Sequence, residues 1–189
     1  MTEIQKPIPE SYWVIPGYLL AGEYPGRYQE ELTRQRLDAM IGAGFDTFID
    51  LTDPHENMSY TQMLQEEARI YDVAVRHFSF PIPDFGLPTP EQMNSILDAI
   101  DETLQEGRKI YLHCWGGIGR TGTVVGCYLV RLGKDGAEAL DQLADWWGGV
   151  PKSRFHPQSP ETAPQRSLVL GWAEYDARSA RPPATLQLS

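Results

Sequence analysis

Long apolar runs, signal-peptide features and clustered metal ligands are all absent from this 189-residue sequence. No apolar run approaches the roughly 20 residues that a membrane-spanning helix needs, so we expect no membrane insertion. The first nine residues lack both a basic segment and an apolar core. We therefore expect no signal peptide and a cytoplasmic protein. The four histidines have no ligand-like spacing, and neither a metal nor another cofactor is expected.

Cysteine is scarce, with only Cys114 and Cys127 in the chain. In a reducing compartment, both are predicted to be free thiols. Cys127 falls in an apolar segment and is expected to be a small core residue, the alternative being a regulatory disulfide with Cys114.

Positive charge is also in short supply, because 16 lysines and arginines face 26 acidic residues and the net charge is −10. Nucleic acids and anionic membranes would repel such a chain, so nucleic acid is not an expected partner. An anionic substrate would need a local concentration of positive potential. The sequence carries no signal for an oligomeric state.

The pattern along the chain is an alternation of strands and helices. Strands are expected at Tyr12–Leu20, Phe45–Leu51, Val73–Phe80 and Lys109–His113. Helices are expected at Glu30–Ile41 (with Leu32 on the buried side), Tyr60–Tyr71, from Thr89 to about Leu104, Thr121–Leu132, Ala137–Trp147 and Glu161–Ala177. This order predicts an α/β fold in which a central mixed, mostly parallel sheet has helices on both faces. We expect one domain over residues 1–178 and a disordered tail over 179–189.

The segment that follows the last predicted strand has the composition of an anion-binding loop. Its glycines allow backbone torsions that larger residues resist, so successive N–H groups can point inward as a nest. The N-terminus of the next helix adds a partial positive charge. Arg120 adds a planar fork of donors that can bind two phosphate oxygens at once. The residues predicted to bind the phosphate are Trp115, Gly116, Gly117, Ile118, Gly119 and Arg120.

Cys114 lies at the mouth of this predicted nest, where its pKa should fall well below the free value of about 8.5. The thiolate is the form that attacks phosphorus, and the surrounding donors would stabilise charge in the transition state. The hydroxyl of Thr121 could stabilise the sulfur when it later leaves as a thiolate. The sequence therefore predicts a nucleophilic cysteine, against the plainer interpretation of a glycine-rich turn with a buried cysteine.

The arrangement His113-Cys114-x5-Arg120-Thr121 resembles the signature loop of the protein tyrosine phosphatase superfamily. The short length and the upstream segments resemble its dual-specificity branch, and the likeness runs from about Trp13 to Trp172. The resemblance implies a mixed sheet flanked by helices and hydrolysis through a phosphocysteine intermediate. It also implies that His113 orients the loop rather than reacting.

Phosphate transfer to a thiolate also needs an acid that protonates the leaving group. Asp84 lies on a proline-rich loop and resembles the mobile general acid of the family. The alternative is an ordinary turn aspartate. Asp53, in a strand-end turn, is the fallback, whereas Asp98 and Asp101 fall within a helix and are poorer candidates.

The segment Glu161-Thr162-Ala163-Pro164-Gln165 resembles the family's glutamine loop. The resemblance implies that Gln165 positions the water that hydrolyses the phosphocysteine, although short dual-specificity members do not all use such a glutamine. The alternative is an exposed helix glutamine. Just upstream, Lys152, Arg154 and His156 are a weaker candidate for binding acidic residues or a second phosphate.

The resemblance favours a phosphoprotein phosphatase that acts on phosphotyrosine and on phosphoserine or phosphothreonine, with phosphorylated proteins as its partners. No tyrosine-bearing recognition loop is recognisable, and its absence favours a shallow pocket. A phosphoinositide or inositol phosphate phosphatase is the first alternative, although residues 115–119 lack the lysines common in lipid phosphatase loops. A non-catalytic phosphoprotein-binding module is the second, and the presence of Cys114, Arg120 and Asp84 counts against it.

Overall fold

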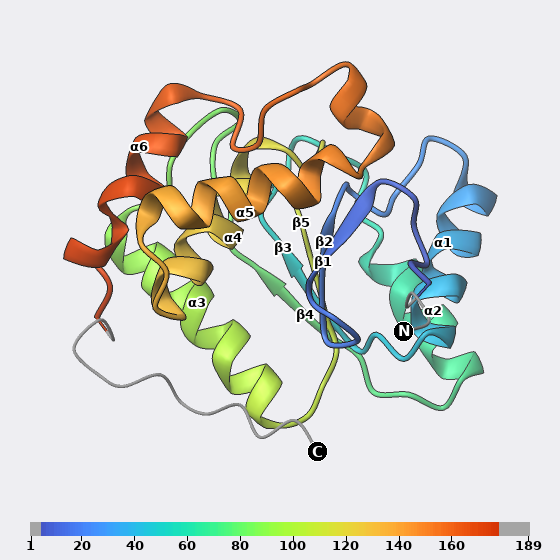
Figure 1. The fold of residues 1–189 in the computed structure, drawn as a ribbon. Helices are drawn as coiled ribbons and strands as arrows, with labels where there is room; N and C mark the ends of the chain where they lie inside the picture. The colour runs from blue at the N-terminus through green and yellow to red at the C-terminus, as the bar shows by residue number, and fades with distance from the viewer. Residues whose placement is uncertain (1–4, 178–189) are drawn as a thin grey trace.

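The computed structural model describes residues 5–177, in which one five-stranded sheet lies between two groups of helices (Figure 1). The strands are β1 (Ser11–Ile15), β2 (Leu19–Gly22), β3 (Thr47–Asp50), β4 (Arg76–Ser79) and β5 (Ile110–His113). The α-helices are α1 (Glu30–Gly42), α2 (Thr61–Ile70), α3 (Pro90–Gln105), α4 (Gly119–Arg131), α5 (Gly136–Gly148) and α6 (Ala163–Gly171). Two short 3₁₀ helices, η1 (Pro151–Arg154) and η2 (Trp172–Glu174), follow α5 and α6. The predicted tail lies outside the described residues.

The strand order is β1-β2-β5-β3-β4, with β5 at the centre of the sheet. The four strands β2, β5, β3 and β4 run parallel to one another. β1 pairs antiparallel with β2 at the edge of the sheet. The sheet is therefore mixed and mostly parallel, as predicted. Parallel strands end on the same edge, so the loops after β3, β4 and β5 meet there, at the upper edge in Figure 1.

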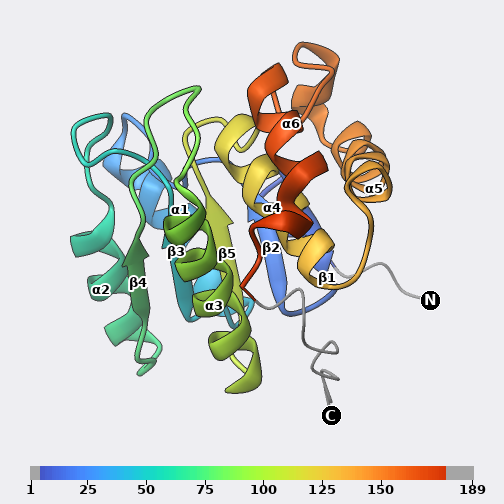
Figure 2. The ribbon, with the colours of Figure 1, turned by 90° about the vertical axis from the view of Figure 1, so that its left-hand side faces the viewer.

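The two faces of the sheet bury two separate apolar clusters. On one face, Ile110 and Leu112 of β5 join a cluster with residues of α3, α4, α5 and α6. On the other, Tyr111 packs with residues of α1 and α2. Figure 2 shows α3, α4 and α6 in front of the sheet, and α1 and α2 lie on its other side. The alternation of side chains along a strand explains this division.

Helix α4 is buried along almost its whole length, as its apolar sequence predicted. It packs against α3, α5 and α6 as well as the sheet. The helix begins at Gly119, two residues earlier than expected, so that Arg120 and Thr121 lie in its first turn. The predicted phosphate-binding segment is thereby joined to a helix that is buried along almost its whole length.

Three sequence-based expectations were wrong in detail. The single strand expected at Tyr12–Leu20 is a hairpin, because Gly17 takes a positive φ of 83° and turns the chain between β1 and β2. Leu32 is exposed rather than buried. The last helix ends at Gly171, and η2 continues the chain in place of the expected single helix to Ala177.

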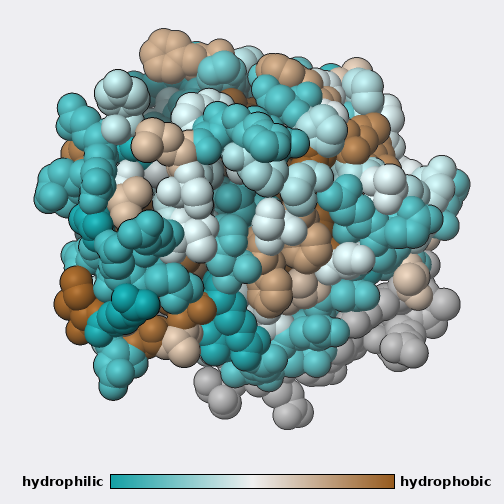
Figure 3. Space-filling model, turned by 180° about the vertical axis from the view of Figure 1, so that it is seen from behind, coloured by the Kyte–Doolittle hydropathy of each residue, from teal (hydrophilic) through white to brown (hydrophobic). Residues whose placement is uncertain are grey.

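The surface seen from behind the view of Figure 1 is largely hydrophilic, with small separate apolar patches (Figure 3). Within residues 5–177, no helix combines the length and apolar character that a membrane crossing requires.

Candidate active site

The loop between β5 and α4 is a tight turn held against the end of β2. Gly117 adopts a positive φ of 73°, and a Cβ atom at this position would lie 2.5 Å from the carbonyl carbon of Gly22. No residue with a side chain could take this place without moving one of the two backbones. The backbone N–H of Tyr24 also donates to the carbonyl of Trp115 at 2.9 Å. The loop is therefore fixed against the end of β2 and the residues that follow it. Cys114 within the loop is buried.

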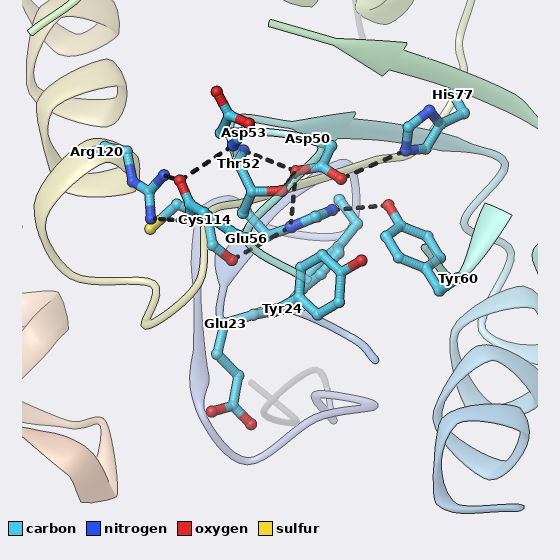
Figure 4. Close-up of polar contacts among 12 residues, drawn as sticks. Glu23, Tyr24, Asp50, Thr52, Asp53, Glu56, Tyr60, His77, Cys114 and Arg120 are labelled. Carbon is cyan, nitrogen blue, oxygen red and sulfur yellow. Dashed lines mark hydrogen bonds and ion pairs between the residues drawn. The ribbon is translucent and has the colours of Figure 1, made fainter. Parts of the chain in front are cut away.

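Arg120 is held by carboxylates on two other loops. Its Nη1 and Nη2 donate to Oε1 and Oε2 of Glu56 at 2.7 and 2.9 Å, and Nη1 also donates to the carbonyl of Ile82 at 3.0 Å. Asp84 Oδ1 lies 3.1 Å from Nη2. Figure 4 shows Glu56 facing the guanidinium beside Cys114. The Arg120 side chain is only 2% exposed, so these partners compensate a charge removed from water.

Glu56 is not among the site residues predicted from the sequence. It lies on the loop after β3, the strand next to β5, and the fold brings this loop to the carboxyl edge of the sheet. A carboxylate in a loop after a parallel strand is the only signal the sequence offered. That signal does not distinguish Glu56 from Asp53 in the same loop.

A cavity of about 410 Å³ opens above the loop. Most of the predicted phosphate-binding residues line it, whereas Gly117 does not, because it faces β2. Three large exposed aromatic side chains, Trp115, Phe85 and Phe155, also line it. The sequence had given no reason to single out the two phenylalanines. The full lining is Asp84, Phe85, Cys114, Trp115, Gly116, Ile118, Gly119, Arg120, Lys152, Phe155, His156, Glu161 and Gln165.

Asp84 is the only aspartate among the described residues that lines this cavity. It lies in a turn closed by a hydrogen bond from Gly86 N to the carbonyl of Pro83 at 2.8 Å, and the side chain is exposed. The fallback Asp53 lines a separate, smaller cavity. Asp98 and Asp101 pair with Arg131, away from the cavity lining. The geometry therefore singles out Asp84 as the candidate acid.

Gln165 is fully buried, so the alternative of an exposed helix glutamine is wrong. It is the third residue of α6 and forms a reciprocal capping box with Thr162. Its Oε1 accepts from Thr162 N at 3.1 Å, and its Nε2 donates to the carbonyl of Gly86 at 3.3 Å. The amide therefore joins α6 to the loop that carries Asp84, on the wall of the cavity.

His113 lies in a buried polar cluster beneath the loop. Its Nδ1 is 3.3 Å from the carbonyl of Cys114, and its Nε2 is 2.7 Å from the hydroxyl of Tyr60. Because a carbonyl only accepts, Nδ1 carries the proton and Nε2 accepts from Tyr60. Burial lowers the pKa of His113 to about 4, so the ring is neutral at pH 7. This arrangement supports the predicted role of His113 in orienting the loop.

Asp50, at the end of β3, adds a charge to this cluster. Its carboxylate accepts from the N–H and hydroxyl of Thr52 at 2.8 and 2.7 Å, and it lies 3.6 Å from Nε2 of His77 (Figure 4). Burial alone would raise the pKa of Asp50, but His113, His77 and Thr52 together lower it to about 2. A fixed negative charge therefore lies behind the loop.

Lys152 and His156 line the cavity, whereas Arg154, the third residue of the predicted basic loop, does not. The ammonium of Lys152 is already engaged, at 2.7 Å from Glu23 Oε2 and 3.0 Å from the carbonyl of Gly116. Burial would raise the pKa of Glu23, but its hydrogen bonds from Lys152 and Arg36 outweigh burial and lower it. Lys152 thus stabilises the loop through its hydrogen bond to Gly116, and its charge is paired with Glu23.

Thr121 is buried, and its hydroxyl has no hydrogen-bond partner among the residues described. Both cysteines are free thiols. Cys127 is fully buried within α4, and burial raises the pKa of its thiol far above the ordinary value. The alternative disulfide with Cys114 is therefore not formed. A search of residues 5–177 finds no group of histidine, cysteine and acidic side chains that could hold a metal ion.

Comparison with known proteins identifies the class of this domain as a phosphatase of the protein tyrosine phosphatase fold. A family model described as the DSP-PTPase phosphatase domain of Swiss Army Knife proteins matches residues 9–166. This match covers most of the chain, and the chain belongs to that family.

Individual relatives agree with this assignment. The chain is 30% identical over 128 residues to protein tyrosine phosphatase domain-containing protein 1 of Mus musculus, a match that covers 64% of this chain and 17% of the mouse protein. The crystal structure of Tk-PTP in the active form is 27% identical, with a TM-score of 0.63 over 90% of this chain and 98% of that one. PTPMT1 in complex with PI(5)P is 15% identical, with a TM-score of 0.66 over 90% of this chain and 99% of that one. At this identity, PTPMT1 shows likeness of fold alone.

Proposed function

We propose that this domain hydrolyses phosphotyrosine in proteins through a phosphocysteine intermediate on Cys114, with phosphoserine and phosphothreonine as slower substrates. The observation that carries the proposal is the composition of the 410 Å³ cavity. Cys114 and Arg120 lie within the same cavity as three exposed aromatic side chains. A phosphate group attached to an aromatic ring matches both parts of such a site.

In the first step, the thiolate of Cys114 attacks phosphorus, and the P–O bond to the tyrosine oxygen breaks. Asp84 gives its proton to the departing oxygen. The loop N–H groups and Arg120 stabilise the charge on the remaining phosphate oxygens. The products of this step are the dephosphorylated side chain and a phosphocysteine.

In the second step, a water molecule attacks the phosphocysteine and gives a proton to Asp84, and the P–S bond breaks. Gln165 lies on the cavity wall beside Gly119, which suits it to position this water. The hydroxyl of Thr121 donates to the departing sulfur. Inorganic phosphate leaves, and both the thiolate and the protonated Asp84 are restored.

The three exposed aromatic side chains of the cavity and the ion pair formed by its lysine favour phosphotyrosine over multiply phosphorylated inositols. Trp115, Phe85 and Phe155 can contact the faces and edges of a phenyl ring. A second phosphate would need a second free cation, whereas Lys152 is bound to Glu23. The cavity is also lined by acidic Asp84 and Glu161. Its charge therefore suits one phosphate group.

A phosphoinositide phosphatase is the alternative function, and the likeness of fold to PTPMT1, solved with PI(5)P, is the observation that favours it. A non-catalytic binding module is less compatible with the shared cavity of Cys114, Arg120 and Asp84.

Phosphate release from a common panel tests these functions. The panel contains one peptide phosphorylated on tyrosine, serine or threonine, micellar phosphoinositides and soluble inositol phosphates, with Cys114→Ser as the control for contaminating activity. We expect the highest kcat/KM for the phosphotyrosine peptide. A higher kcat/KM for a phosphoinositide than for every phosphopeptide would overturn the proposal.

A further inference from the structure

A second cavity, of about 200 Å³, lies beside the candidate active site. Three apolar or aromatic side chains around it are strongly exposed, namely Tyr28 (98%), Met58 (79%) and Trp115 (54%). Large exposed apolar side chains gathered around one hollow are typical of a binding surface. The remaining lining residues are Tyr24, Gly26, Arg27, Glu56 and Asn57.

The two charged side chains of this second cavity are already paired. Both carboxylate oxygens of Glu56 bind the guanidinium of Arg120. Arg27 forms an ion pair with Glu23. The hydroxyl of Tyr24 donates to the backbone carbonyl of Met58 at 3.0 Å, so its ring is the part left for a ligand. The cavity therefore suits an apolar group rather than a second phosphate.

Trp115 connects the two cavities, because it is a lining residue of both. The indole contacts the ring of Tyr24, with the centroids 5.7 Å apart, and the backbone carbonyl of Trp115 accepts a hydrogen bond from Tyr24 N. Trp115 also follows Cys114 directly in the chain. A peptide whose phosphorylated residue occupies the larger cavity can therefore place a neighbouring residue in the smaller cavity, on the other side of Trp115.

We propose that the smaller cavity is a specificity subsite that takes an apolar side chain within two residues of the phosphotyrosine in a protein substrate. This inference rests on the proposed function. A peptide is favoured over a lipid, because a net charge of −10 and the carboxylate of Glu161 at the larger cavity oppose an anionic membrane surface. A volume of about 200 Å³ also suits one side chain better than an acyl chain.

The test compares phosphotyrosine peptides that carry leucine, alanine or glutamate at each of the two positions before and after the phosphotyrosine. In the wild-type protein, leucine at one of these positions should raise kcat/KM about tenfold over alanine, the size of discrimination that an apolar pocket gives a larger side chain. Glutamate there should be no better than alanine. Hydrolysis of para-nitrophenyl phosphate, which has no flanking residues, gives the reference activity.

Met58→Ala and Tyr28→Ala remove apolar walls of the subsite without touching the proposed chemistry. Each should reduce the preference for leucine to about twofold and leave para-nitrophenyl phosphate turnover unchanged. Ile70→Ala is the matched control, because Ile70 is an equally exposed apolar residue (74%) at the end of α2, outside the lining of both cavities. It should keep the full preference.

Two results would overturn the subsite while leaving the proposed function intact. One is efficient hydrolysis of phosphotyrosine peptides with no preference at any flanking position. The other is a preference that survives in both Met58→Ala and Tyr28→Ala. Hydrolysis of phosphoinositides without hydrolysis of any phosphopeptide would instead reject the proposed function, and the subsite with it.

Discussion

Replacement of Glu56 by glutamine should slow the enzyme without unfolding it. Glu56 binds both terminal nitrogens of Arg120, at 2.7 and 2.9 Å, and so fixes the plane of the guanidinium that the phosphate must meet. Glutamine keeps the shape and one acceptor oxygen but loses the charge and one of the two hydrogen bonds. Arg120 keeps the carbonyl of Ile82 and the carboxylate of Asp84 as partners.

The size of this effect follows from the contacts. A hydrogen bond to a charged group contributes about 1.5–3 kcal/mol. The Glu56 side chain is partly exposed, which favours a value of about 2 kcal/mol, toward the lower part of that range. If this orientation is needed in the transition state, kcat/KM should fall about thirtyfold. Glu56→Ala, which removes both acceptors, should lose more.

The assay is kcat/KM for para-nitrophenyl phosphate, together with the inhibition constant of inorganic phosphate and the Tm. Phosphate should bind more weakly in Glu56→Gln, because the guanidinium of Arg120 that holds it is less well oriented. A loss of stability alone would lower Tm and leave this inhibition constant unchanged. Glu66→Gln is the matched control, since Glu66 pairs with Arg34 on the surface at 2.6 Å. Activity of a folded Glu56→Gln within threefold of wild type would refute the reasoning.

Two further predictions concern the acid and the buried histidine. Asp84→Asn should lower kcat about a hundredfold for substrates with poor leaving groups and much less for activated aryl phosphates; an equal loss for all leaving groups would remove Asp84 from the role of acid. His113 should make the fold acid-sensitive, because its pKa is 6.5 in the unfolded chain and about 4 in the folded protein. As the pH falls through this window, protons bind the unfolded chain preferentially, and the free energy of unfolding should fall by up to about 3 kcal/mol. Denaturant unfolding at several pH values should show that His113→Gln flattens this dependence more than His156→Gln, which alters an exposed ring; equal slopes in the two variants would contradict the account.

The composition of the β5–α4 loop, for which phosphate binding is proposed, could be read from the sequence because its residues lie in one continuous segment. Cys114, the glycines and Arg120 are specified by type and spacing, and the structure brings most of them to one cavity. The apolar stripe of α3 and the apolar residues all round α4 are equally local patterns, and the structure buries this stripe of α3 and almost the whole of α4. Periodicity and short-range spacing carry these features.

The partners of the loop could not be predicted, because they come from distant parts of the chain. Glu56 follows β3, and Glu23, which pairs with Lys152 beneath the loop, follows β2. Their places depend on the strand order and on how the loops fold over the sheet edge, which no local pattern records. The turn at Gly17 was missed for another reason, because the apolar residues on both sides of it read as one continuous strand.

The most direct test of the central claim is to trap the phosphocysteine. Wild-type protein is mixed with a radiolabelled phosphotyrosine peptide and quenched in acid within the first turnover, and its proteolytic peptides are then analysed by mass spectrometry. The account predicts a phosphate group on the sulfur of Cys114, which disappears as inorganic phosphate is released and never forms in Cys114→Ser. Sustained turnover by Cys114→Ser, or label found on any residue other than Cys114, would contradict it.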